Sequence, residues 1–205
     1  MNILNTYSFG GLVYTFSCYI RTRIFYPQSR IIRFPFDIRG EKYIDLGTRL
    51  TLGKYCRFEV FPHLMAYNAE KKLIIGSDVQ MNDNVHICAM EKVQIGNNVL
   101  MASNIYISDN SHGCYKESSC CNNSDPSVPP IKRSYYVKPV HIGDNVWIGQ
   151  GVVINPGVSI GKGTIVGANS VVTHSFPDNC VIAGAPAKII KKYSPDSKCW
   201  ISRKV

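Results

Sequence analysis

The sequence lacks the patterns that define several large protein classes. Its 205 residues include no Cys-x-x-Cys pair, and only 18% of them are charged. The absence of that pair argues against a zinc site on paired cysteines. The Gly-x-Ser-x-Gly stretch at residues 157–161 is not followed by a helical pattern and so is no nucleophile elbow, and we expect no acyl-enzyme formed on a serine. No export signal accompanies the eight cysteines, so we expect reduced thiols.

Long apolar runs are also missing. Residues 1–26 mix apolar and aromatic residues with Asn, Ser, Thr and the pair Gly10-Gly11, which is too polar for a membrane-spanning helix of about 20 residues. No basic segment or small-residue cleavage site marks a secretory signal. We predict a short helix that ends near Arg21 and Arg23, and that either packs on the end of the fold or lies at a membrane interface.

The net charge of +9 favours an anionic partner. A phosphorylated cofactor and an acidic membrane face both fit. We expect no nucleic-acid partner, because no DNA- or RNA-binding motif is present and the Lys and Arg residues cluster near the two ends of the chain.

A strict period of six residues runs through residues 142–177, which read IGDNVW, IGQGVV, INPGVS, IGKGTI, VGANSV and VTHSFP. Neither a helix nor a simple half-buried strand has this period. Short strands that turn a corner every six residues do have it, because the aliphatic first positions then stack into one core. The pattern predicts an all-β fold, a parallel β-helix with about 18 residues per triangular coil. Gly and Asn beside the corners suit a backbone that bends or enters positive φ.

The period also divides the rest of the chain. We predict an N-terminal helix and lead-in strands in residues 1–45, a β-helix domain in residues 46–187, and a cap and tail in residues 188–205. Residues 113–139 break the register and form a long excursion loop. It is either a tolerated surface insertion or, as we expect, a lid or partner-clasping loop, because it directly follows a candidate catalytic histidine, His112. A capping helix over residues 187–193 is expected to cover the last coil.

These residues carry a family resemblance. Residues 146–190, which include the run AGAPAK, together with the segment SDNSHG, closely resemble the hexapeptide-repeat acyltransferases and their sugar O-acetyltransferase branch. The resemblance implies a left-handed coil, a homotrimer with active sites between subunits, and acetyl-CoA as the acetyl donor. It covers roughly residues 46–192.

The chemistry implied is acetyl transfer from a thioester to an alcohol, which needs a base for the hydroxyl proton and a donor for the oxyanion. Histidine suits the base at neutral pH. His112 aligns with the catalytic histidine of the family. His86 is the last residue of a six-residue repeat one coil earlier. It is either a rim residue near the substrate or a corner residue. Asp109 either orients His112 or shapes the turn before it.

The resemblance also implies binding residues. Asn82 and Asn84 match the acceptor-binding zone, although a corner-forming role explains them equally well. Trp147 matches a residue beside the active site and the pantetheine arm. The coenzyme A zone matches Trp147, Gln150, Ala168, Thr173, His174, Ala183, Gly184, Lys188 and Lys191. We expect no metal.

We therefore predict an O-acetyltransferase that acts on a sugar hydroxyl of a bacterial surface polysaccharide, such as O-antigen, capsule or exopolysaccharide, or its precursor. The expected location is the cytoplasm, with peripheral membrane contact through the N-terminal segment left open. The alternatives are a relative that acts on a free sugar, an amino sugar, serine or an antibiotic. A γ-carbonic-anhydrase-like or non-catalytic solenoid is the second alternative, and the former would need three histidines around zinc.

Overall fold

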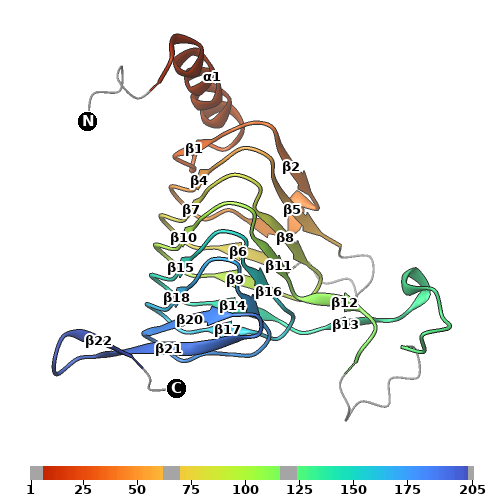
Figure 1. The fold of residues 1–205 in the computed structure, drawn as a ribbon. Helices are drawn as coiled ribbons and strands as arrows, with labels where there is room; N and C mark the ends of the chain where they lie inside the picture. The colour runs from red at the N-terminus through yellow and green to blue at the C-terminus, as the bar shows by residue number, and fades with distance from the viewer. Residues whose placement is uncertain (1–6, 62–69, 116–123, 203–205) are drawn as a thin grey trace.

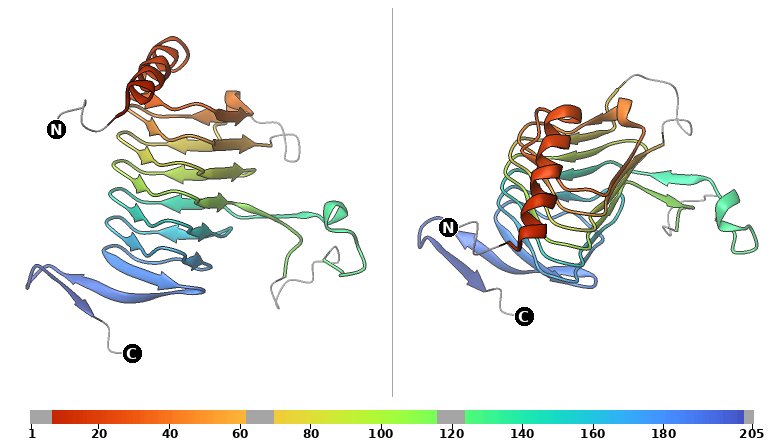
Figure 2. Two further views of the ribbon diagram at one scale, coloured as in Figure 1. Left: turned by 45° about the horizontal axis from the view of Figure 1, so that its top comes forward. Right: turned by 90° about the horizontal axis from the view of Figure 1, so that it is seen from above.

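The chain winds into a three-sided prism with a helix across its N-terminal end (Figures 1 and 2). The computed structural model describes residues 7–61, 70–115 and 124–202. Residues 116–123 of the predicted excursion loop, with Cys120 and Cys121, lie outside the described residues.

Each coil contributes one strand to each of three sheets, and all pairs within the prism are parallel. The first sheet contains β1 (Ile31–Ile32), β4 (Thr51–Leu52), β7 (Gln80–Met81), β10 (Leu100–Met101), β15 (Trp147–Ile148), β18 (Ile165–Val166) and β20 (Cys180–Gly184). The second contains β2 (Phe36–Arg39), β5 (Cys56–Val60), β8 (His86–Ala89), β11 (Tyr106–Ser108), β16 (Val153–Ile154) and β19 (Val171–Val172). The third contains β3 (Ile44–Asp45), β6 (Leu73–Ile75), β9 (Val93–Ile95), β14 (Val140–Ile142) and β17 (Ser159–Ile160). A short 3-10 helix, Glu41–Tyr43, precedes β3.

The six-residue period places aliphatic side chains in continuous internal columns. One column joins Leu52, Met81, Met101, Ile148, Val166 and Ile182, all of them buried. Full burial of such a side chain contributes about 1.5–3 kcal/mol. Stacking of the coils therefore supplies the stability that no isolated coil has.

The corners need Asn and Gly for two reasons. Asn84, Asn98 and Asn145 adopt positive φ values between 56° and 59°. Gly157 does so at 82°. The glycine in the second position of a repeat is required by close packing: a Cβ at Gly143 would lie 2.7 Å from the backbone nitrogen of Lys162 in the next coil. The predicted positive φ thus holds for both residue types, and contact between coils explains Gly143.

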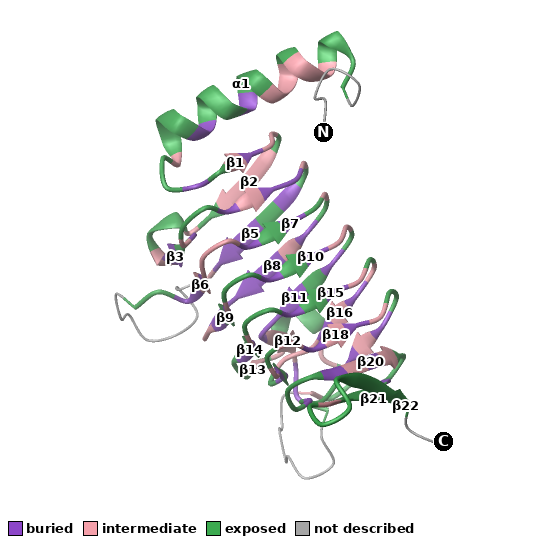
Figure 3. Ribbon diagram, turned by 90° about the vertical axis from the view of Figure 1, so that its left-hand side faces the viewer, coloured by how far each residue is buried: buried purple, intermediate pink, exposed green. Residues whose placement is uncertain are grey.

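The helix α1 (Phe9–Phe25) packs on the end of the prism by one face, and Ser8 caps its N-terminus. Its buried residues are Cys18 and Thr22, and the Thr22 hydroxyl accepts a hydrogen bond of 2.8 Å from the backbone N–H of Ile32. Most of the remaining helix surface is exposed (Figure 3). The predicted N-terminal helix is therefore confirmed.

The predicted C-terminal capping helix is wrong. Residues 187–193 lie in β21 (Ala187–Ser194), which pairs antiparallel with β20 and then with β22 (Cys199–Ser202). The reason is the free edge of β20, whose N–H and C=O groups need partners that a strand supplies and a helix does not. Gly184, at a φ of 106°, allows the chain to reverse there.

Candidate active site

The chain leaves the prism directly after β11 and forms a projecting arm. β12 (Asn110–His112) and β13 (Tyr135–Val137) pair antiparallel, with His112 opposite Tyr135. The arm extends away from the prism and carries a 3-10 helix, Pro130–Lys132, beyond β13 (Figures 1 and 2). The excursion predicted after His112 is thus partly regular structure.

His112 lines a hollow of about 830 Å³ between the arm and the six-stranded sheet. Its ring lies 4.7 Å from that of Tyr135, measured between centroids. Its Nδ1 atom is buried and has no hydrogen-bond partner among the described residues. Nε2 is therefore the ring nitrogen that can accept a proton from a molecule in the hollow. The other lining side chains include Glu59, His86, Tyr106, Ser108, Asn110, Asn155 and Thr173.

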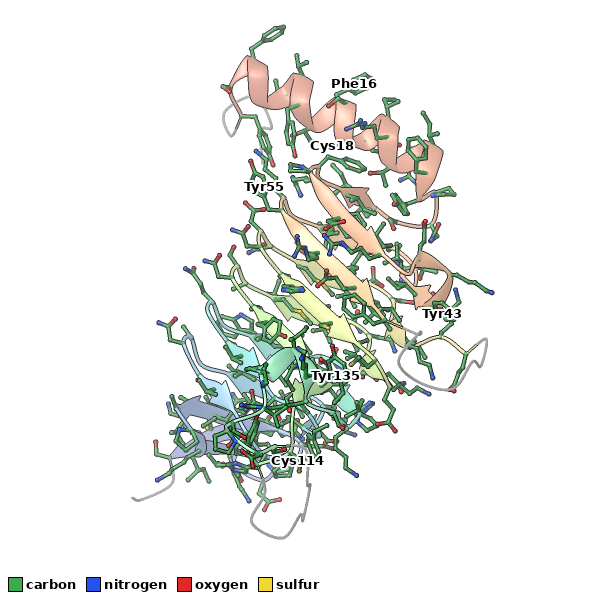
Figure 4. The ribbon with its side chains drawn as sticks, turned by 90° about the vertical axis from the view of Figure 1, so that its right-hand side faces the viewer. Phe16, Cys18, Tyr43, Tyr55, Cys114 and Tyr135 are labelled. Atoms are coloured by element: carbon green, nitrogen blue, oxygen red, sulfur yellow. The ribbon has the colours of Figure 1, made fainter. Side chains whose placement is uncertain are left out.

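The arm is tied to the backbone of His112. The Tyr115 hydroxyl donates to the His112 carbonyl at 2.5 Å, and Arg133 Nη1 donates to the same hydroxyl at 2.7 Å. Arg133 Nε also donates to the Val128 carbonyl at 2.9 Å. These bonds hold the returning part of the arm against the residue that would act as base. Cys114 and Tyr135 lie on this part of the molecule (Figure 4).

Asp109 is fully buried, and its carboxylate binds backbone N–H groups of the preceding coil. Its carboxylate accepts backbone N–H groups from Met90, Glu91 and Lys92 at 2.8–3.1 Å and the Asn110 side-chain amide at 3.0 Å. No bond joins it to His112 among the described contacts. The sequence left two roles open for Asp109, orienting His112 or shaping the turn before it. These contacts fit the second role.

His86 forms an acid–base pair with a buried carboxylate, and the sequence did not reveal this pair. Its Nε2 lies 2.7 Å from Oε2 of Glu59, a side chain only 8% exposed. Glu59 Oε1 accepts a bond of 2.7 Å from Arg39 Nη1. The His86 ring also packs edge-on against Tyr106 at 5.2 Å. His86 thus lines the hollow that contains His112, and its role near the substrate stays a prediction.

Asn82 and Asn84 occupy a corner outside this hollow. Both are exposed, and Asn84 has a φ of 59°. The Asn82 carbonyl accepts a bond from the Cys56 thiol at 3.2 Å. Asn84 lines a second hollow, of about 450 Å³, that also includes His86. The corner-forming role of Asn84 is therefore visible, and any acceptor contact would come through the second hollow.

Trp147 lies on a different sheet from the His112 hollow. It is 50% exposed in β15, between Leu100 and Ile165 of the neighbouring strands. It does not line the His112 hollow. A single chain therefore does not place the two residues in one pocket.

The residues predicted for coenzyme A fall into a C-terminal group and a corner pair. A hollow of about 590 Å³ is lined by His174, Ala183, Gly184 and Lys188. Thr173 lines the His112 hollow, and its hydroxyl lies 3.3 Å from His174 Nδ1, so these neighbours connect the two hollows. Lys191 lies in β21 opposite Val181.

Gln150 and Ala168 lie at exposed corners of successive coils, away from both hollows. The Gln150 carbonyl accepts the N–H of Asn169.

Five of the six cysteines that the structure describes are buried. Cys56 is buried, and desolvation raises the pKa of its thiol to about 11, so the thiol stays neutral at physiological pH. Among the described residues, no disulfide joins Cys18, Cys56, Cys88, Cys114, Cys180 and Cys199. In the described ranges, no group of three His, Cys, Asp or Glu residues is arranged to hold a metal ion.

Sequence reasoning missed Glu59, Arg39 and Tyr135. Glu59 follows the inward-facing Phe58, so alternation along the strand places it on the outer face, and a carboxylate there is unremarkable by sequence. Only the stacking of β2, β5 and β8 shows that Arg39, Glu59 and His86 meet.

Comparisons with known proteins agree with this architecture. The family model "Bacterial transferase hexapeptide (six repeats)" matches residues 139–174. The chain is 40% identical over 200 residues to WbbJ of Escherichia coli K12, whose provisional name is lipopolysaccharide biosynthesis O-acetyl transferase, and 98% of this chain and 97% of WbbJ are covered.

Two solved structures extend the comparison. Galactoside acetyltransferase in complex with coenzyme A shares 30% identity at a TM-score of 0.50, over 80% of this chain and 68% of that one. AntD of Bacillus cereus, an N-acyltransferase bound to dTDP-4-amino-4,6-dideoxyglucose and coenzyme A, has a TM-score of 0.66 and covers 83% of this chain and 84% of its own. At 21% identity, AntD shows a likeness of fold alone.

Proposed function

The chain belongs to the hexapeptide-repeat acyltransferases, and from this premise we propose that it transfers an acetyl group from acetyl-CoA to a sugar hydroxyl of a lipopolysaccharide or its precursor. The observation that carries the proposal is the near full-length likeness to WbbJ. The hollow that contains His112 supports it, because it joins a candidate base to polar side chains suited to a sugar.

His112 would act as the general base. With its proton on the buried Nδ1, the neutral ring presents the lone pair of Nε2 to the acceptor hydroxyl. As the hydroxyl oxygen attacks the thioester carbonyl, its proton moves to Nε2. That attack forms the new C–O bond. When the tetrahedral intermediate collapses, the C–S bond breaks, and the proton passes from Nε2 to the departing sulfur of coenzyme A.

The acetyl donor would approach from the C-terminal hollow. Lys188 and Lys191 offer positive charge for phosphates, and Ala183 and Gly184 leave room for the pantetheine arm. Thr173 and His174 lead from there toward His112. Galactoside acetyltransferase, which shares this architecture, is solved with coenzyme A.

A homotrimer would complete the site. His112 lies on the arm beside the six-stranded sheet. Trp147 lies on the first sheet, which β21 and β22 extend to nine strands, so a neighbouring chain is needed to bring the two residues together. In a cyclic assembly every interface is the same, and each would carry one site. We include left-handed winding of the coils, as in the rest of the family, in this proposal.

Peripheral membrane contact through α1 is the accompanying proposal for location at the inner face of the membrane. Phe9, Val13, Phe16, Ile20 and Ile24 form an exposed apolar stripe opposite the buried Cys18 and Thr22. Basic residues flank this stripe, as in helices that lie in the plane of an acidic membrane. No helix in the described ranges is long and apolar enough to span a bilayer.

The test is release of coenzyme A from acetyl-CoA, with mass detection of acetylated product, over nucleotide sugars and lipid-linked glycans. His112→Ala should lower kcat by about 10²–10⁴-fold, because general-base catalysis is lost. His141→Ala is the matched control, because His141 is exposed on β14 of another sheet. Equal turnover by the wild-type protein and His112→Ala would overturn the assignment.

A further inference from the structure

A row of polar side chains runs down the outer face of the six-stranded sheet toward His112. In this row Asp37, Arg57, His86 and Tyr106 lie in register on β2, β5, β8 and β11. Neighbouring strands are about 4.8 Å apart, so this row is roughly 14 Å long. That length exceeds one pyranose ring.

Two hollows share this face. The hollow of about 830 Å³ contains His112, and the hollow of about 450 Å³ is lined by Phe36, Asp37, Tyr55, Arg57 and Asn84, with Pro35 and Cys56. His86 lines both. They therefore form adjacent compartments of one groove, with the His86–Glu59 pair at the junction.

The second hollow offers little unpaired charge. Asp37 Oδ2 lies 3.1 Å from Arg57 Nε and 3.0 Å from Arg39 Nη2. Glu59 pairs with Arg39 on one oxygen and with His86 on the other. Because both arginines already have carboxylate partners, a phosphate would have to break these pairs to bind. The hollow therefore favours a neutral ligand.

Tyr55 supplies an aromatic surface at a conformational cost. It has a φ of 58° and is 63% exposed, whereas corresponding corners of later coils use Asn84, Asn104 or Asn169. A bulky residue in this region of φ is uncommon. Its side chain has no hydrogen bond or ring contact among the described residues. Figure 4 shows Tyr55 at the edge of the prism near α1, toward the opposite end from Tyr135.

From these observations we propose that the second hollow is a subsite for a neutral sugar unit next to the one that is acetylated. The inference rests on the proposed function. The apolar face of the sugar packs on Tyr55, and its hydroxyls bond to the Asn84 amide and the Asp37 carboxylate. The acceptor is accordingly a glycan of at least two sugar units, and a free monosaccharide is a poorer substrate.

Binding is tested first, on the full-length His112→Ala protein, with saturation-transfer NMR. The probes are glucose against maltose, galactose against lactose, and N-acetylglucosamine against chitobiose. In at least one pair the disaccharide should bind roughly tenfold more tightly than the monosaccharide, because the second sugar unit adds one set of pocket contacts. Inorganic phosphate should not compete. Equal binding within all three pairs, or displacement by phosphate, would overturn the subsite.

The variant is Tyr55→Asn, which removes the ring and restores the usual corner residue, so that folding is preserved. It should abolish the preference for the disaccharide and leave monosaccharide binding unchanged. Trp200→Ala, which removes an exposed aromatic side chain on β22, is the control and should keep the preference. Retention of the preference by Tyr55→Asn would contradict the proposal.

Turnover separates this inference from the proposed function. In a catalytically intact background, Tyr55→Asn should lower kcat/KM for the preferred disaccharide by about tenfold and leave the monosaccharide value within about twofold. A disaccharide preference in binding without acetyl transfer to any glycan would support the subsite and refute the proposed function. Transfer at equal kcat/KM to both members of every pair would overturn the subsite alone.

Discussion

At the scale of single residues, one buried carboxylate holds two coils together. Asp109 stands where the chain leaves the prism, and it binds three consecutive N–H groups of residues 90–92 in the preceding coil. A turn that presents three buried donors needs such an acceptor, because each unsatisfied donor costs about 1–3 kcal/mol. Asp109 thereby fixes the point from which β12 carries His112 outward.

Asp109→Asn should lower the free energy of unfolding by about 3 kcal/mol, because the amide group brings a donor against the N–H groups of Glu91 and Lys92. Urea denaturation measures this loss. Asp144→Asn is the control: Asp144 is exposed and accepts the Asn97 N–H at 2.6 Å, so we expect a loss below about 1 kcal/mol. Unchanged stability with a raised acceptor KM would instead assign Asp109 to substrate binding.

At the scale of elements, α1 has two faces with different tasks. Cys18 and Thr22 contact the prism, and Tyr14 reaches the Phe34 carbonyl with a bond of 2.6 Å. Phe9 and Phe16, on the opposite face, are 83% and 66% exposed. An apolar surface of this kind on a folded chain usually marks a place of contact.

The triple variant Phe9→Ser, Phe16→Ser, Ile24→Ser should lose most binding to vesicles that contain anionic lipid, because it removes the apolar face and leaves the buried face intact. Sedimentation with liposomes measures the bound fraction. A control that replaces Ser17, Gln28 and Lys198 with Ala should bind as the wild type does. Equal sedimentation of the triple variant and wild type would show that α1 does not contact the membrane.

At the scale of the whole molecule, a single prism separates His112 and Trp147 on two sheets. A homotrimer of 22.9 kDa chains, with a mass of about 69 kDa, would bring the arm of one chain beside the nine-stranded sheet of the next. Multi-angle light scattering gives this mass directly.

Hybrid trimers test whether the site is shared. His112→Ala and Trp147→Ala chains should each be impaired alone, but a mixed trimer contains one interface with both side chains intact. We expect about one third of wild-type activity in purified hybrids, by symmetry. Co-expression with two different tags isolates them. Hybrids no more active than the parent variants would place the complete site within one chain.

Much of the fold follows from local pattern. Aliphatic first positions fix the inward columns, and Asn at the corners fixes positive φ at positions such as Asn98 and Asn145. The same reading placed His112 at the exit from the prism. It failed at residues 187–193, where local sequence is compatible with a helix and the unpaired edge of β20 decides for a strand.

The sequence by itself determined the stacked coils, because a period of six is a local property that only one arrangement of short strands buries. Tertiary structure alone decided which polar side chains meet. Glu59 and His86 are 27 residues apart, yet they share a hydrogen bond because the coil that contains β6 and β7 returns the chain to the same sheet in register. The register between coils therefore decides which side chains line the groove beside His112. This register cannot be read from any single six-residue repeat.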